Sequence, residues 1–270
     1  MKNHIRRSSA IVYRHLMYLR KPFEMFHYWY WILIDILIFG FLGKSVGRSL
    51  AACSAGDIST AHIIFVNMVL LYAFLRGAVN MGMAFLRELW EYNFVTIFST
   101  QLQVLDWLIA LGTLCICTGC LSFSIAAFLV RVIFGFSIFS FGWIVFLQLL
   151  LLLSAGFCMG LIINSILLIL GKQATPLTWA LGWLFVPISG VYYSIDVIPP
   201  FLQRVAVYNP LYHIFSITRA TVAHAPAEVW HQAGIAALLL LIYGSACLLL
   251  FTYAFNKSKK AGLTRLEVES

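Results

Sequence analysis

Two charged residues stand inside long apolar stretches of the sequence. Asp35 lies near the middle of the segment 25–43, and Arg76 lies in the second half of the segment 59–84. If the segments are helices that run in opposite directions, the two residues differ in depth by about 3–5 Å. A charge inside a membrane is costly, so it is usually paired or functional. We therefore expect either a pair that fixes the two helices, which we favour, or a place in a substrate path.

A second group of charges lies in the segment 85–101, which is too long for a simple turn. Glu88 and Glu91 are three residues apart, so they share one face of a helix. Arg87 and Trp90 lie beside them. A charged helix with aromatic side chains suits docking into the groove of a partner protein. The alternative is a surface helix that contacts only lipid headgroups.

Residue patterns of several common enzyme classes are missing from the sequence. The one Gly-Lys-Ser sequence, at 43–45, has Ile38 where a phosphate-binding loop needs glycine. Cys115 and Cys117 would point about 200° apart on a helix, so with Cys120 they do not converge on a metal. We therefore expect no ATP site of this kind, no metal and no catalytic role for the chain.

The composition indicates a membrane protein. Of 270 residues, 62% are hydrophobic and only 10% are charged. Soluble domains have roughly 45–50% apolar and about 25% charged residues. This chain cannot cover a soluble globule with charge, which excludes an ordinary cytosolic enzyme. The net charge of +8 comes from basic residues outside the apolar stretches, so membrane topology explains it and we expect no nucleic-acid partner.

The apolar stretches predict an all-α membrane domain, 25–255, with six spans. A span needs about 20 apolar residues, and the segments that qualify are 25–43, 59–84, 104–130, 138–170, 174–195 and 232–255. Glycine and serine cluster between 131 and 142, where we expect a turn. With the N-terminus inside, 12 basic residues lie on the inner side and 5 on the outer side. Both termini are therefore predicted to be cytoplasmic.

The remaining segments predict three further elements. Residues 1–24 contain an amphipathic, basic stretch that is typical of a helix lying on the inner leaflet. The outer segment 196–219 predicts two short re-entrant helices broken by proline, which line a cavity. Residues 256–270 form a cytoplasmic tail. Gly156 and Gly160 permit close helix packing, either within the chain or between two copies, and the sequence does not choose.

The run 171–219 resembles the C-terminal signature of the permease subunits of type-2 ABC (ATP-binding cassette) exporters. The residues that carry the resemblance are Pro187, Gly190, Val191, Tyr192, Tyr193, Ile198, Pro199, Asn209, Pro210 and Arg219. Segment 85–110 is similar to the coupling-helix region of the family, and 25–43 is similar to the first span of one branch. The chain departs from the pattern at Gln101, Ser194 and Ser216, where the family often has Pro, Pro and Glu.

The resemblance implies half of a pore without its own energy source. Two copies of the permease, expected to be a homodimer, would associate with two ABC ATP-binding subunits that bind ATP-Mg. The helix 85–101 would couple to the ATPases through Arg87, Glu88, Trp90 and Glu91. The outer gate and substrate path would include Tyr192, Tyr193, Pro199, Pro210 and Arg219. The expected location is the bacterial inner membrane, in contact with membrane lipid.

The substrate implied for such a permease is an amphiphile, either a lipid, a lipid-linked glycan or polysaccharide, or a hydrophobic drug. It would move outward across the membrane. The alternative function is a membrane-embedded transferase that acts on a lipid substrate. Such an enzyme needs clustered acids or histidines at one interface, and the ten acidic residues are scattered instead.

Overall fold

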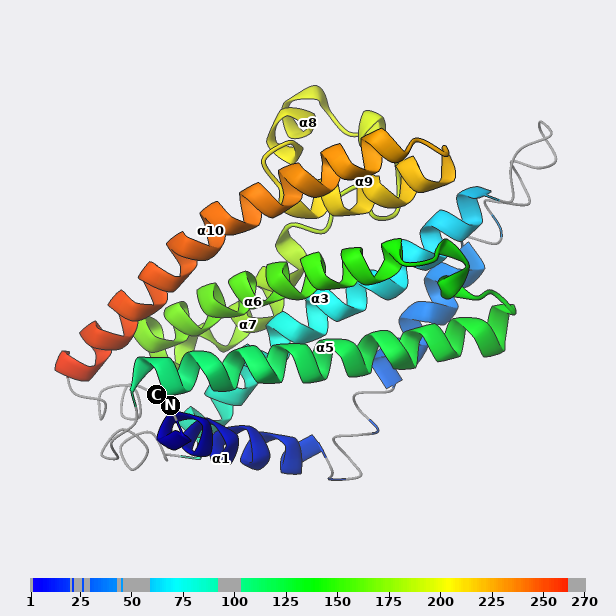
Figure 1. Cartoon of the computed structure of the whole chain (residues 1–270). Helices are drawn as coiled ribbons and strands as arrows, with labels where there is room; N and C mark the ends of the chain where they lie inside the picture. Colours follow the sequence, from blue (N-terminus) through cyan, green and yellow to red (C-terminus); the bar gives the residue numbers. More distant parts are fainter. Residues whose placement is uncertain are drawn as a thin grey trace.

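The computed structural model describes residues 2–19, 21, 26, 30–42, 45, 59–91 and 103–261. All regular secondary structure within these ranges is helical, as the sequence predicted (Figure 1). The longer helices are α1 (Lys2–Leu19), the helix Tyr30–Leu42, α3 (Ser59–Trp90), α5 (Val104–Phe134), α6 (Ile144–Leu170) and α10 (Pro226–Ala261). The shorter ones are α7 (Thr175–Leu184), α8 (Pro200–Ala206), α9 (Pro210–Val222) and the 3-10 turns η1 (Ile138–Phe141), η2 (Gly171–Ala174) and η3 (Ile195–Val197).

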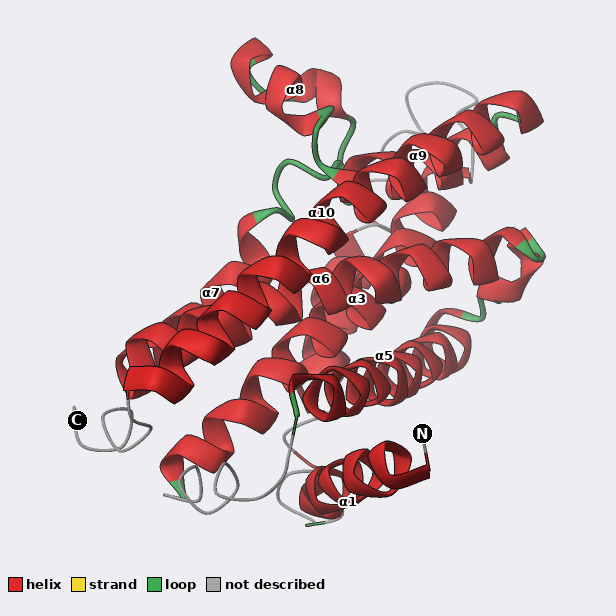
Figure 2. Ribbon diagram, turned by 60° about the vertical axis from the view of Figure 1, so that its left-hand side comes forward, coloured by secondary structure: helices red, strands yellow, loops and turns green. Residues whose placement is uncertain are grey.

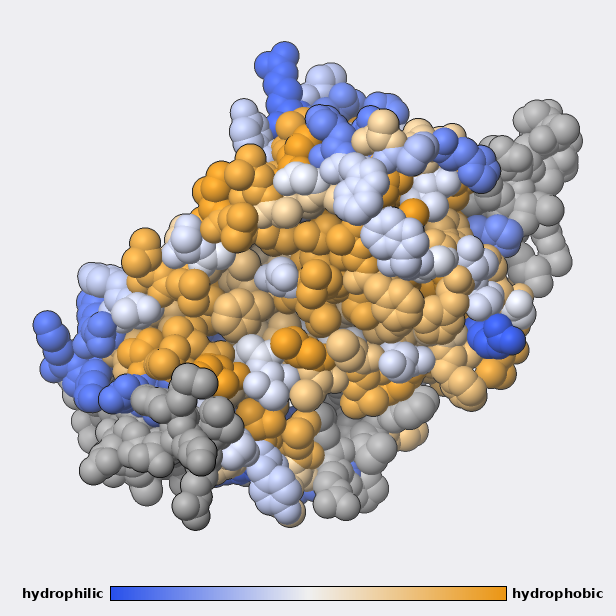
Figure 3. Space-filling model, in the orientation of Figure 1, coloured by the Kyte–Doolittle hydropathy of each residue, from blue (hydrophilic) through white to orange (hydrophobic). Residues whose placement is uncertain are grey.

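Four segments are long and apolar enough to cross a membrane, which indicates a membrane protein. They are His62–Trp90, Val104–Phe134, Ile144–Leu184 and Pro226–Lys260. Figure 3 shows that hydrophobic side chains cover the middle of the visible face, while hydrophilic ones gather toward its ends. This distribution matches a bilayer core bounded by two polar interfaces.

The segment Ile144–Leu184 contains two helices that run in opposite directions. Gly160 of α6 lies against Met81 of α3, and Gly156 lies against Phe74, so α6 advances in the same direction as α3. In α7, Thr178 lies near Gly82 while Gly182, further along α7, lies near Val79, so α7 runs the other way. The chain reverses at Gly171, whose φ of 66° is in the left-handed region that glycine tolerates.

The helix α3 occupies the centre of the bundle, with α5 and α6 packed closely on it. A Cβ on Gly119 of α5 would lie 2.8 Å from the carbonyl oxygen of Ala73. A Cβ on Gly156 of α6 would lie 3.1 Å from the carbonyl oxygen of Phe74. Small residues allow such close approach of membrane helices. Gly156 and Gly160 therefore pack within the chain, which answers the question that the sequence left open.

The N-terminal helix α1 lies alongside the first turns of α5 (Figures 1 and 2). Ser8 Oγ donates a hydrogen bond to the carbonyl oxygen of Asp106, at 3.0 Å. The carboxylate of Asp106 in turn accepts from the backbone N–H of Gln103 and caps α5. The C-terminal part of α10 ends at the same end of the bundle as α1 (Figure 1).

The segment between α7 and α10 is a chain of short helices. The helices α8 and α9 each begin at a proline, Pro200 and Pro210, whose missing N–H is harmless in a first turn. The helix α7 ends at Leu184, well before the predicted end of a span at 195. Within the predicted coupling segment, α3 simply continues to Trp90, and residues 92–102 lie outside the described residues.

Candidate functional site: an aromatic cavity on α3

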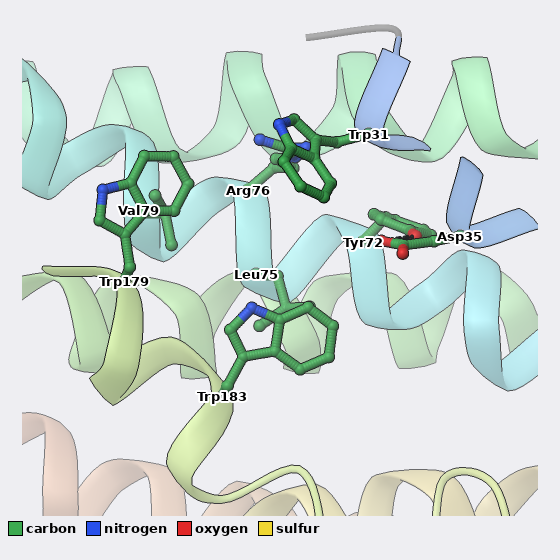
Figure 4. A pocket seen from close by; sticks show the side chains of 8 residues that line it. All are labelled: Trp31, Asp35, Tyr72, Leu75, Arg76, Val79, Trp179 and Trp183. Carbon is green, nitrogen blue, oxygen red and sulfur yellow. Dashed lines mark hydrogen bonds between the residues drawn. The ribbon is translucent and has the colours of Figure 1, made fainter. Parts of the chain in front are cut away.

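A cavity of about 440 Å³ lies on the side of α3 that α5 and α6 leave uncovered (Figure 4). Three elements supply its walls: the helix Tyr30–Leu42, α3 and α7. The lining residues are Trp31, Asp35, Tyr72, Leu75, Arg76, Val79, Trp179 and Trp183. The cavity therefore brings the two intramembrane charges of the sequence into one space with three tryptophans.

The polar part of the cavity is built from Asp35, Tyr72 and Arg76. Tyr72 Oη donates a hydrogen bond to Asp35 Oδ2 at 2.6 Å, and Figure 4 shows the two side chains turned toward each other. Arg76 follows Tyr72 by one helical turn and is 9% exposed. It lies about 25 Å from the start of α3 and about 21 Å from its end, hence near the middle of this helix. The direct Asp35–Arg76 pair stays a prediction, while Tyr72 is the partner that sequence reasoning missed.

The tryptophans give the cavity an aromatic wall that is open at its side. Trp31, Trp179 and Trp183 are 45%, 41% and 41% exposed. Trp179 and Trp183 are four residues apart, so they share one face of α7 and project toward α3 (Figure 4). Indole rings offer large apolar faces and one N–H donor each. Together with a carboxylate and a guanidinium, they can hold a molecule that has both polar and apolar parts.

Three of the predicted gate residues fix the irregular backbone that follows α7. Tyr192 stacks on Phe39, with ring centroids 4.5 Å apart and planes 13° apart. Tyr193 Oη donates to the carbonyl oxygen of Pro187. Arg219 of α9 donates from Nη1 to the carbonyl oxygen of Gly190, at 2.7 Å. Non-helical backbone at membrane depth needs such partners inside the protein.

Two amides and a serine complete this network. Asn67 Nδ2 donates to the carbonyl oxygen of Val191 at 3.4 Å, and Asn209 Nδ2 donates to that of Phe185 at 3.1 Å. Ser216, where the family pattern often has Glu, accepts from Arg219 Nη2 at 2.9 Å. Ser216 therefore helps to hold the guanidinium of Arg219 in place.

The two predicted gate prolines lie at the starts of short helices. Pro199 immediately precedes α8, and Pro210 is the first residue of α9, after the N-cap Asn209. Asn209 Oδ1 accepts from the backbone N–H of Leu211 at 3.1 Å, which satisfies one of the free donors of the helix start. A role of these residues in a gate stays a prediction.

The predicted coupling acids contact α1 within the same chain. Arg14 Nη2 lies 3.2 Å from Glu88 Oε2 and 2.9 Å from Glu91 Oε2. Glu88 is 2% exposed, so a partner protein cannot reach it directly while α1 is docked. Trp90 is 46% exposed and Glu91 is exposed too, so these two remain accessible from outside the bundle. Arg14 was not identified from the sequence, because no spacing relates α1 to α3.

A buried histidine lies beside the contact between Arg14 and Glu88. His15 is 4% exposed, and its Nε2 lies 3.6 Å from Glu88 Oε1. Burial, followed by the positive charges of Arg87 and Arg14, lowers the pKa of His15 to about 4, against an opposing effect of Glu91. The imidazole is therefore neutral at pH 7, and its approach to Glu88 is not an ion pair there. Arg87 lines a small cavity together with His15.

The described residues contain no group of three or more His, Cys, Asp or Glu side chains that could hold a metal ion. Cys115 is buried against α3 and α6, whereas Cys117 is exposed. The cysteines of α5 therefore point in different directions.

A comparison with protein-family models finds no family that matches the chain, and a search of the curated proteins finds no match either. A functional assignment consequently depends on the geometry of the cavity and on the sequence resemblance.

Proposed function

We propose that the chain is the transmembrane permease subunit of an ATP-binding cassette exporter. Its substrate is an amphiphile, which includes lipids, lipid-linked glycans and hydrophobic drugs. The observation that carries the proposal is the sideways-open cavity at the middle of α3, with Asp35, Arg76 and three tryptophans. Intramembrane charges that face a cavity mark substrate pathways in many membrane proteins. An amphiphile can enter such a cavity from the bilayer and present a polar group to the charges.

The order of helices supports six crossings in the manner of type-2 ABC permeases. The helix Tyr30–Leu42, α3, α5 and α6 follow one another, and α7 begins a fifth passage that residues 185–191 continue as irregular backbone beside Asn67. The helix α10 is the sixth. An even number of crossings fits the location of α1 and of the end of α10 at one end of the bundle (Figure 1). The charge distribution in the sequence favours the cytoplasm for that end.

The same end offers a surface for ATPase subunits. Tyr13 is 63% exposed, Met17 is 47% exposed and Trp90 is 46% exposed, all near the ion pairs of Arg14. Exposed aromatic and Met side chains beside charges are typical of protein interfaces. We propose that two ATPase subunits with bound ATP-Mg dock here on a dimer of the chain in a bacterial inner membrane. The energy for transport would come from these partners.

Purification from native membranes tests the proposal. Full-length chain should bring down an ATPase subunit, and the complex should hydrolyse ATP while the chain stripped of its partner does not. Trp90→Ala should reduce the recovered ATPase several-fold, because it removes an exposed aromatic side chain from the proposed interface. Trp230→Ala is the matched control, since Trp230 is 59% exposed on the first turns of α10, far from α1. Equal recovery with both variants, or ATP hydrolysis by the stripped chain, would contradict the proposal.

A further inference from the structure

A second cavity lies on the opposite side of the segment that follows α7. Its volume is about 340 Å³, within the range of small-molecule sites. Residues of α6, α10 and the α8–α9 junction form its walls, together with Phe74, Phe185 and Ile188. Phe185 and Ile188 belong to the backbone that leaves α7, whereas Trp179 and Trp183 of α7 line the first cavity. The two cavities therefore flank one broken helix.

The second cavity is lined mostly by apolar side chains, and two of its polar side chains, Asn209 and Tyr243, are hydrogen-bonded to backbone. Asn209 uses its amide to bond Phe185 and Leu211. Tyr243 Oη donates to the carbonyl oxygen of Tyr208 at 2.9 Å. A water molecule needs two to four polar partners, whereas most of the lining residues are apolar. The cavity therefore suits a hydrocarbon chain.

The cavity is accessible from the lipid side. Only 22% of the most apolar stretch of α10 is buried inside the protein, so most of this helix faces outward. Val205 and Tyr208, which line the cavity, are 50% and 69% exposed. Ala246 also lines the cavity and is exposed. A lipid chain can thus enter from the bilayer between the α8–α9 junction and α10.

An exposed cation neighbours two lining residues, Val205 and Tyr208, along the chain. Arg204 is exposed and directly precedes Val205 in the last turn of α8. A guanidinium binds phosphate with two parallel hydrogen bonds, and this contact is stronger than one between neutral groups. We propose that the cavity holds one acyl chain of an anionic phospholipid whose phosphate is bound by Arg204. This site is independent of the proposed transport function.

Lipid binding by the purified full-length chain tests the site. The delipidated protein is mixed with phosphatidylglycerol, with phosphatidylcholine or with palmitate, and the retained molecules are counted by native mass spectrometry. We expect one retained phosphatidylglycerol. Arg204→Gln should weaken its binding about tenfold, the equivalent of about 1.4 kcal/mol, because a charge-assisted contact is lost. Arg131→Gln, a change at another exposed arginine, is the control and should leave binding unchanged.

A second pair of variants tests the chain cavity itself. Ala246→Phe fills the cavity and should reduce phosphatidylglycerol retention at least about fivefold, a change of about 1 kcal/mol. Ser245→Phe adds the same bulk at a neighbouring exposed residue that does not line the cavity, so retention should persist. Equal retention by these two variants, equal binding by the two arginine variants, or equally tight binding of palmitate and phosphatidylglycerol would each overturn the proposal.

A measurement on the unmutated protein covers the case in which Ala246→Phe fails to fold. Cys158 of α6 and Cys247 of α10 both line the cavity. Phosphatidylglycerol should slow their alkylation by a membrane-permeant maleimide, while Cys117, exposed on α5, should react at an unchanged rate. Equal rates with and without the lipid at all three cysteines would overturn the proposal.

Discussion

The two sides of α3 differ in how closely other helices pack against them. Toward α5 and α6, the neighbouring helices contribute glycines, and Gly119 and Gly156 bring backbones almost into contact. Toward the helix Tyr30–Leu42 and α7, the same helix carries Tyr72 and Arg76 and leaves a cavity of about 440 Å³. One side has no space for a methyl group, and the other has space for a ligand.

Under the proposed transport function, the closed side of α3 serves stability and the open side serves transport. Close packing with small residues supplies much of the association energy of helices in lipid, because there is no hydrophobic driving force between them. The closed side can therefore hold the bundle together, so that the other side can keep charges and space that cost stability. Changes on the closed side should lower stability, and changes on the open side should lower transport at nearly constant stability.

The largest expected effect is a pH dependence at the end of the closed side, where α1 covers α3 and α5. His15 has a pKa near 6.5 when exposed and about 4 when buried, so the unfolded state binds more protons between these values. The stabilisation is present above pH 6.5 and is lost as the pH falls toward 4. It amounts to about 3 kcal/mol at most. Thermal unfolding and protease cleavage within α1, measured between pH 7.5 and 4, should show it.

Burial raises the pKa of Glu88, so this carboxyl also contributes to the pH dependence, and the comparison with His15→Gln isolates the histidine. The variant should show a flatter pH dependence than the unmutated chain. Identical slopes would mean that α1 does not bury His15.

The next effect concerns the close packing of Gly119 of α5 against α3. In Gly119→Leu, the new side chain meets Ala73 backbone and Leu153, and overpacking of this kind costs about 2–3 kcal/mol. The control is Gly234→Leu, because a Cβ on Gly234 of α10 meets nothing within 4 Å. Unfolding of the detergent-solubilised proteins measures both. Equal stability of Gly119→Leu and Gly234→Leu would show that the packing of α5 on α3 is not as close as the structure has it.

A change on the open side should act on transport instead. Trp183→Ala removes part of the aromatic wall and should lower ATP-driven export about tenfold, equivalent to about 1.4 kcal/mol of lost binding. The unfolding temperature should change little, since Trp183 is 41% exposed. Export and unfolding are measured on the same preparation, with Trp230→Ala as the control. A loss of stability without a loss of export would reverse the assignment of the two sides.

The smallest effect is expected at the rim of the α1 contact. Glu91→Gln removes one exposed contact of Arg14 but leaves its contact with Glu88 in place. Exposed ion pairs contribute about 0.5 kcal/mol and are weakened by salt. Unfolding measured at low and high salt should show this difference shrinking. A larger loss of stability than in Gly119→Leu would show that the contacts of α1, and not the close packing at Gly119, dominate stability.

The all-helical membrane character could be predicted from the sequence, because composition and the length of apolar stretches determine it directly. The turn before α6 was also visible, since Gly135 and Gly142 adopt positive φ there, at 71° and 69°. The end of α7 at Leu184 was not predicted. The apolar pattern continues beyond it, and the partners that hold the irregular backbone, such as Arg219, come from distant parts of the chain.

The candidate site was predicted in part. Asp35 and Arg76 were found because charges are rare in apolar segments, and the structure places both on one cavity. The aromatic wall was missed, although the spacing of Trp179 and Trp183 was a usable signal. The spacing of Glu88 and Glu91 indicates that they share one helix face. It does not indicate whether that face contacts a partner or α1, because this depends on how the chain folds back on itself.

The most direct test of the account places a photo-crosslinking amino acid, benzoylphenylalanine, at position 183 in cells. Position 241 is the control, because Leu241 is 73% exposed on α10 and does not line the first cavity. We expect position 183 to capture an amphiphile that position 241 does not capture, and the captured amount to change when ATP is depleted. Capture of the same lipids at both positions, with no response to ATP, would contradict a transport site on the open side of α3.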